Sequence, residues 1–99
     1  MAKEFPKLHG KLVLAPMHNI TNIAFRLMCK KYGASLVSTE LLSANAISRK
    51  NKAVMELAFT DKSEKPVSCQ LFSQNTKHII QAAKIIEDKF NIIDFNLGC

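Results

Sequence analysis

Polar and reactive side chains stand at the ends of four short β-rich segments of the sequence. The segments are residues 12–15, 35–39, 66–71 and 92–96. A carboxylate (Glu40), two amides (Gln70 and Asn96) and a thiol (Cys99) lie at or just after the carboxyl ends of three of them. Strands buried on both faces of a parallel sheet are otherwise nearly all apolar. This asymmetry predicts a binding or catalytic site at one edge of a sheet.

Each of these side chains has a chemical and a structural interpretation. Gln70 and Asn96 carry paired donors and acceptors suited to holding a heteroaromatic ring, or else they satisfy loop backbone groups as buried amides often do. Cys99 follows a glycine just after the end of a predicted strand, where its thiol is able to reach a bound substrate. The alternative, on equal terms, is that the Cys99 thiol is packed as a structural residue. Glu40 either contacts a ligand or forms a structural ion pair with Arg26.

Stretches with helical spacing separate the β-rich segments. One apolar stripe comprises Ile20, Ile23, Ala24, Leu27 and Met28, and another comprises Ile79, Ala82, Ala83, Ile86 and Phe90. Residues 43–58 predict one helix or two short helices broken near Asn51, and Gly33 is expected to end the first helix. The candidate caps are Asn19 or Thr21 for the first helix and Ser73 or Asn75 for the last.

The alternation of strands and helices predicts an α/β protein with parallel strands. The turn after the first segment has no G-x-G-x-x-G fingerprint, which disfavours a dinucleotide-binding doubly wound sheet. We therefore expect a TIM (β/α)8 barrel. Such a barrel needs roughly 250 residues, so residues 1–99 are expected to form its N-terminal half, with about four parallel strands and three helical connections. The open sheet edges predict self-association.

The composition of the 99 residues narrows the class of protein. A hydrophobic fraction of 47% is that of a globular protein, and the net charge of +6 with a pI near 9.4 favours a polyanionic partner. The sequence has no run of eighteen apolar residues, which predicts that it does not span a membrane. It has no signal-peptide pattern, which predicts a cytoplasmic protein. Its three cysteines show no metal-ligand spacing, and we expect Cys29 and Cys69 to be packed as small apolar residues.

A set of motifs in a fixed order resembles the opening of the tRNA-dihydrouridine synthases. The motifs are Ala15-Pro16-Met17, Thr21-Asn22-Ile23-Ala24-Phe25-Arg26, Gly33-Ala34, Thr39-Glu40, Gln70-Leu71 and Asp94-Phe95-Asn96-Leu97-Gly98-Cys99. The resemblance runs from about Leu12 to the last residue. Asn22 and Ala24 depart from the usual aspartate and proline of the family, which predicts a looser start to the first helix.

The resemblance implies an FMN enzyme that reduces uridine in tRNA to 5,6-dihydrouridine. FMN would lie at the mouth of a TIM barrel that is followed by a smaller helical domain. Ala15, Pro16 and Met17 would line the isoalloxazine ring and Gln70 would hydrogen-bond it. NADPH would reduce the flavin, which gives hydride to C6 of the uracil, and Cys99 would act as general acid toward C5.

The resemblance also assigns the remaining site residues and the partner. Asn96 would orient the flavin and the uracil, Glu40 would contact the substrate, and the positive charge would hold the tRNA backbone. We expect no metal, and no catalysis by residues 1–99 alone. Two alternatives remain at the level of the sequence: another FMN barrel of the dihydroorotate dehydrogenase kind, and a non-catalytic basic half-barrel that binds RNA or a partner chain.

Overall fold

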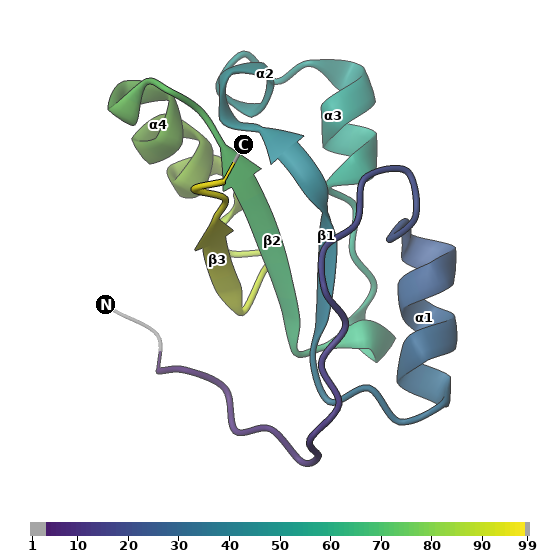
Figure 1. The fold of residues 1–99 in the computed structure, drawn as a ribbon. Coiled ribbons are helices and arrows are strands. Elements are labelled where there is room, and N and C mark those ends of the chain that lie inside the picture. The colour runs from purple at the N-terminus through teal and green to yellow at the C-terminus, as the bar shows by residue number, and fades with distance from the viewer. Residues whose placement is uncertain (1–3, 99) are drawn as a thin grey trace.

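A computed structural model describes residues 4–98 of the chain (Figure 1). Its elements are α1 (Ile23–Lys31), β1 (Val37–Ser43), α2 (Ala44–Ser48), α3 (Lys52–Leu57), the 3-10 turn η1 (Lys62–Glu64), β2 (Val67–Phe72), α4 (Thr76–Ile86) and β3 (Ile92–Phe95). The three strands form one parallel sheet in the order β1-β2-β3. The predicted α/β class and the parallel pairing are therefore confirmed.

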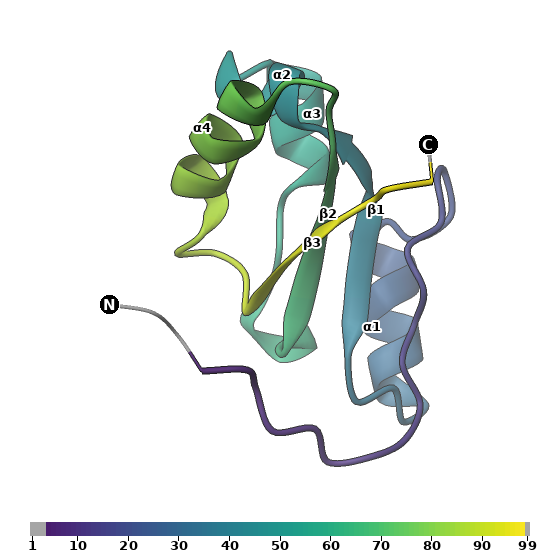
Figure 2. The same cartoon turned by 60° about the vertical axis from the view of Figure 1, so that its left-hand side comes forward.

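The helices cover one face of the sheet (Figures 1 and 2). Helices α2, α3 and α4 lie together on one side of the strands in Figure 2, and α1 lies beside β1 in Figure 1. The apolar core lies between these layers and contains Val37, Leu42, Val67, Leu71 and Ile86, which are all fully buried. Within residues 4–98, no helix has the length and apolar character needed to cross a membrane.

The predicted first strand at residues 12–15 is wrong as a sheet strand. Val13 forms a single parallel bridge to Leu36, supported by two backbone hydrogen bonds of 2.9 and 2.8 Å. The hydroxyl of Ser35 also donates to the carbonyls of Gly10 and Leu12. These contacts fix the N-terminal segment along the edge of β1, so the described chain has three strands and one bridge instead of four strands.

A β-bulge interrupts β1. Ser38 pairs with Ser68 and Leu41 with Gln70, so β1 uses one residue more than β2 between these two pairs. The Thr39 hydroxyl takes the place of a ladder carbonyl by accepting the N–H of Gln70 at 3.1 Å. The bulge places Thr39 and Glu40 inside the strand, which continues to Ser43, whereas the sequence predicted that they end it.

Local capping explains the helix boundaries. Asn22 accepts the N–H of Phe25 at 3.0 Å and caps α1, which corrects the predicted caps Asn19 and Thr21. The looser helix start expected from Asn22 and Ala24 stays a prediction. Gly33 follows the end of α1 with φ of 105°, as predicted. Asn75 caps α4, and the break near Asn51 separates α2 from α3.

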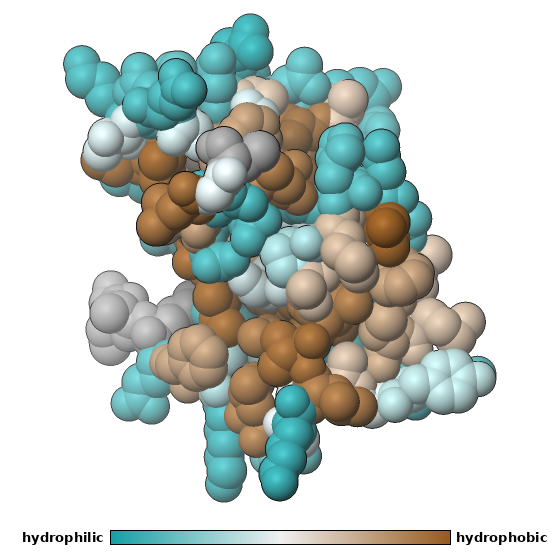
Figure 3. Space-filling view, in the orientation of Figure 1, coloured by the Kyte–Doolittle hydropathy of each residue, from teal (hydrophilic) through white to brown (hydrophobic). Residues whose placement is uncertain are grey.

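Apolar side chains spread over the molecular face seen in the view of Figure 1 (Figure 3). Large apolar side chains are exposed in the N-terminal segment, at Leu12 and Val13, and at and after the end of β3, at Phe95 and Leu97. Parallel sheets are usually buried on both faces. In this three-stranded sheet the described helices cover only one face, so the other face is open to further parts of the protein.

Candidate active site

The loop between the N-terminal segment and α1 carries Pro16 and Met17. The Met17 carbonyl accepts the N–H groups of Ile20 and Thr21 at 3.1 and 3.0 Å. The fully buried Thr21 hydroxyl accepts the N–H of Met17 at 3.1 Å. The loop is thus closed on itself, with Pro16 and Met17 half-buried and Ala15 exposed at the carboxyl end of the sheet.

Glu40 holds the same loop from β1. Its Oε1 accepts the N–H of Asn19 at 2.6 Å, and its side chain is almost fully buried. Asn19 has φ of 61°, a left-handed conformation that asparagine tolerates better than most residues. The predicted ion pair between Glu40 and Arg26 is therefore wrong, and the contact that the structure gives Glu40 is with the loop backbone.

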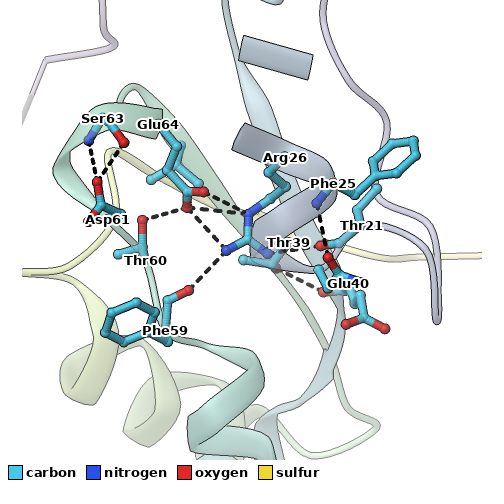
Figure 4. Close-up of polar contacts among 12 residues, drawn as sticks. Thr21, Phe25, Arg26, Thr39, Glu40, Phe59, Thr60, Asp61, Ser63 and Glu64 are labelled. Atoms are coloured by element: carbon cyan, nitrogen blue, oxygen red, sulfur yellow. Dashed lines mark hydrogen bonds and ion pairs between the residues drawn. The ribbon is translucent and has the colours of Figure 1, made fainter. Parts of the chain in front are cut away.

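Arg26 pairs instead with Glu64 of η1 (Figure 4). Both side chains are fully buried, and three nitrogen–oxygen distances between them are 3.1 to 3.2 Å. Arg26 also donates to the carbonyls of Thr21 at 2.8 Å and Phe59 at 2.9 Å, while the Thr60 hydroxyl donates to Glu64. Through Thr21, this network fixes the loop that carries Pro16 and Met17.

Three polar side chains meet at the carboxyl ends of β2 and β3. Gln70 pairs in register with Asp94, and its Nε2 donates to Asp94 Oδ2 at 2.8 Å. Asn96 Nδ2 donates to Gln70 Oε1 at 3.4 Å, and Asn96 Oδ1 accepts the N–H of Gly98 at 2.9 Å. Gln70 is buried, Asn96 is half-buried and Asp94 is exposed. The structure thus brings the two predicted amides together.

Asp94 belongs to this cluster and was not among the residues predicted for the site. The signal was present in the sequence, because residues two apart in a strand share a face, and Asp94 precedes Asn96 by two. The cluster offers donors and acceptors in alternation, which is what a ring with neighbouring carbonyl and N–H groups requires.

The described cysteines are structural. Cys69 is fully buried in the core, and desolvation by burial raises the pKa of its thiol to about 12. Cys29 packs partly buried against the same core. Both agree with the predicted role as packed apolar residues. Cys99, the predicted general acid, lies outside the described residues.

A cavity of about 440 Å³ opens between α2 and the start of α4, beside the carboxyl ends of β1 and β2. Its lining residues are Ser43, Asn45, Phe72, Ser73, Gln74, Asn75 and His78. Sequence reasoning missed this cavity, because its walls come from segments that only the fold brings together. Across residues 4–98, the structure contains no cluster of three His, Cys, Asp or Glu side chains able to hold a metal ion.

Parallel strands joined by helices, with polar side chains at their carboxyl ends, define an α/β protein with a candidate ligand site at that end of the sheet. Residues 13–99 match the family model for dihydrouridine synthase (Dus). The chain belongs to the dihydrouridine synthase family.

Curated relatives support this assignment. A probable tRNA-dihydrouridine synthase of Aquifex aeolicus (strain VF5) is 41% identical over 92 residues, which are 91% of this chain and 29% of that protein. tRNA-dihydrouridine synthase B of Shewanella oneidensis is 34% identical, covering 94% of this chain and 29% of that protein. A tRNA-dihydrouridine(16/17) synthase of Saccharomyces cerevisiae, whose name includes NAD(P)(+), is 32% identical over 88% of this chain and 21% of its own length. The chain thus spans less than a third of the length of these relatives.

Proposed function

We propose that this chain is part of an enzyme that reduces uridine in tRNA to 5,6-dihydrouridine. The observation that carries the proposal is the cluster of Gln70, Asp94 and Asn96 at the carboxyl ends of adjacent parallel strands, in a chain of the dihydrouridine synthase family. The names of the relatives identify tRNA-dihydrouridine synthases. The family assignment disfavours a dihydroorotate dehydrogenase.

Residues 1–99 are proposed as the N-terminal half of a (β/α)8 barrel. The parallel pairing of strands in chain order and the helices on one face of the sheet support this arrangement. Later strands would complete the barrel and enclose the sheet face that the helices leave open, and a smaller helical domain would follow. Self-association through the open sheet edges stays a prediction.

The residues present fit FMN. The amides of Gln70 and Asn96 match the carbonyl and N–H groups on the pyrimidine edge of a flavin, and the half-buried Pro16 and Met17, with Ala15 beside them, offer a largely apolar surface for its ring. A flavin reduced by a nicotinamide supplies the hydride for this reaction. We take NADPH as the reductant, in line with the name of the yeast relative.

The chain's own residues would hold the ring and deliver a proton. Gln70 would fix the flavin, and Asn96 would orient flavin and uracil. Cys99 would give a proton to C5 of the uracil, because hydride addition at C6 builds negative charge that an acid must quench. A substrate contact by Glu40 is proposed only as an addition to its observed hydrogen bond with Asn19.

The basic residues suit a tRNA partner. Arg49 and Lys50 are exposed in the turn between α2 and α3, and Lys52 is exposed as the first residue of α3. Helix α2 directly follows the carboxyl end of β1. Lysine and arginine near the site would hold phosphates while the target uridine leaves its stack. Since the proposed substrate is tRNA, the cytoplasm is the proposed location.

The test uses the protein expressed from the whole reading frame that encodes this chain. Its visible spectrum is recorded with and without NADPH, and dihydrouridine is measured in tRNA that lacks the modification. Flavin bands that bleach with NADPH, and dihydrouridine that is lost in Cys99→Ala but retained in the matched control Cys69→Ala, are the expected results. A colourless protein, or a flavoprotein inactive on tRNA, would overturn the proposal.

A further inference from the structure

The cluster at the ends of β2 and β3 has a fixed direction of hydrogen bonding. Gln70 donates to Asp94, Asn96 donates to Gln70, and the Gly98 N–H donates to Asn96. Each amide therefore uses its oxygen on one side and its NH2 group on the other. The arrangement is a chain of four groups that begins at the carboxylate of Asp94.

Asp94 is the group that decides this direction. A side-chain amide is able to present either its oxygen or its NH2 group to a neighbour, whereas an ionised carboxylate only accepts. Gln70 must therefore turn its NH2 group to Asp94, at 2.8 Å. Its oxygen then faces Asn96, which must present its own NH2 group.

The rest of Gln70 has little freedom to respond in another way. Its backbone N–H is held by the Thr39 hydroxyl at 3.1 Å, and the residue is 8% exposed in the ladder between β1 and β3. Rotation of the terminal amide plane is the remaining adjustment, and it exchanges oxygen for NH2. A neighbour that accepts only is enough to block that exchange.

We propose that Asp94 is a positioning residue that fixes the polarity of both amides toward a cyclic imide, which rests on the proposed function. After the observed bonds, Gln70 retains one N–H and one oxygen lone pair, and Asn96 retains one N–H. These groups form a donor–acceptor–donor set. A cyclic imide has the complementary order of C=O, N–H and C=O, and both the flavin and uracil carry one.

The experiment compares Asp94→Leu, which removes the acceptor, with Asp94→Asn, which keeps one oxygen. Asp88→Asn is the matched control, since Asp88 is an exposed carboxylate outside the cluster. The protein from the whole reading frame is titrated with FMN, and the KM for tRNA is measured separately. Side-chain amide resonances of Gln70 and Asn96 are followed by NMR in the same variants.

We expect Asp94→Leu to weaken one of the two interactions about tenfold, the effect of one misplaced hydrogen-bonding group. A weaker FMN affinity assigns the imide to the flavin, and a higher KM with unchanged FMN affinity assigns it to the uracil. Asp94→Asn should lose less, and Asp88→Asn nothing. Only the Asp94 variants should shift the amide resonances.

Unchanged FMN affinity and unchanged KM in Asp94→Leu would overturn the inference. If that variant does not fold, the same criterion applies to Asp94→Asn: wild-type values for both, with unmoved amide resonances, overturn it. If the wild-type protein binds neither FMN nor tRNA, the proposed function fails. In that case the resonances still test whether Asp94 sets the polarity of the amides.

Discussion

Two networks of hydrogen-bonded polar side chains in this molecule differ in how deeply they are buried. The first joins Arg26 and Glu64, both fully buried, to backbone carbonyls and the Thr60 hydroxyl. The second joins Gln70, Asp94 and Asn96, of which Asp94 is exposed. The charges of the first network have protein partners on all sides, whereas the second keeps hydrogen-bonding capacity facing outward.

The difference in burial distinguishes a network that supports the fold from one that is a candidate binding site. A buried charge without a partner is costly, so a network such as that of Arg26 is complete by itself and holds the loop of Pro16 and Met17 in place. The groups of the second network are free to exchange water for a ligand. Exposure and unused donors distinguish the two networks better than residue type does.

The largest effect should come from breaking the buried network. Arg26→Met leaves Glu64 buried without its partner, and we expect a loss of about 3–5 kcal/mol in the free energy of unfolding. Denaturant unfolding measures this loss. Arg49→Met, at an exposed position, should change stability by no more than about 0.5 kcal/mol. Equal stability of the two variants would contradict the scaffold role.

Gln70→Ala should show the opposite balance of effects. Removing this amide is expected to weaken FMN binding at least about tenfold, because it removes a donor and an acceptor, while stability falls by only about 1 kcal/mol. Flavin titration and denaturant unfolding of the same protein check both values. The control is Gln81→Ala on the exposed side of α4. A large loss of stability with unchanged FMN affinity would assign Gln70 to the scaffold.

Thr39→Val tests the link between β1 and the second network. Valine has nearly the same shape but cannot accept the N–H of Gln70, so a buried donor loses its partner. The expected cost is about 1–2 kcal/mol of unfolding free energy. Thr39→Ser keeps the hydroxyl and serves as the control. If valine and serine behave alike, the hydroxyl does not support the bulge.

The free energy of unfolding at alkaline pH should depend on Cys69. Burial raises the pKa of its thiol from 9.0 to about 12, so between these values the unfolded chain loses a proton that the folded chain keeps. Stability is therefore unaffected below about pH 9 and falls above it, by up to about 1.4 kcal/mol per pH unit. Unfolding measured from pH 8 to 10.5 should show a shallower fall in Cys69→Ala than in Cys29→Ala. Parallel curves would exclude this contribution.

The parts of the fold that depend on local signals were predictable. Gly33 ends α1, Asn75 caps α4, and the break near Asn51 follows the sequence. The candidate site was predictable to the extent that Gln70 and Asn96 come from the carboxyl ends of neighbouring strands. The alternation of strands and helices implies parallel pairing, and parallel pairing brings these carboxyl ends to the same edge of the sheet.

The rest depends on contacts between distant residues. Within α1 the buried side chain is Arg26, while Met28 of the predicted apolar stripe is exposed, because Glu64 provides a charged partner that is 38 residues away. The segment at 12–15 has the composition of a strand but reaches β1 through only one bridge. Asp94 escaped notice because its importance lies in its register with Gln70.

The bulge in β1 makes the length of that strand part of its function. Val37 and Leu42 are five positions apart, and both enter the core opposite Val67 and Leu71, which are four apart. Deleting Thr39 or Glu40 would make both spacings four and remove the bulge, and with it either the hydroxyl that accepts the Gln70 N–H or the carboxylate that accepts the Asn19 N–H. The extra residue therefore lets one strand hold both the Gln70 backbone and the loop that carries Pro16 and Met17, which a regular strand of the same span would not do.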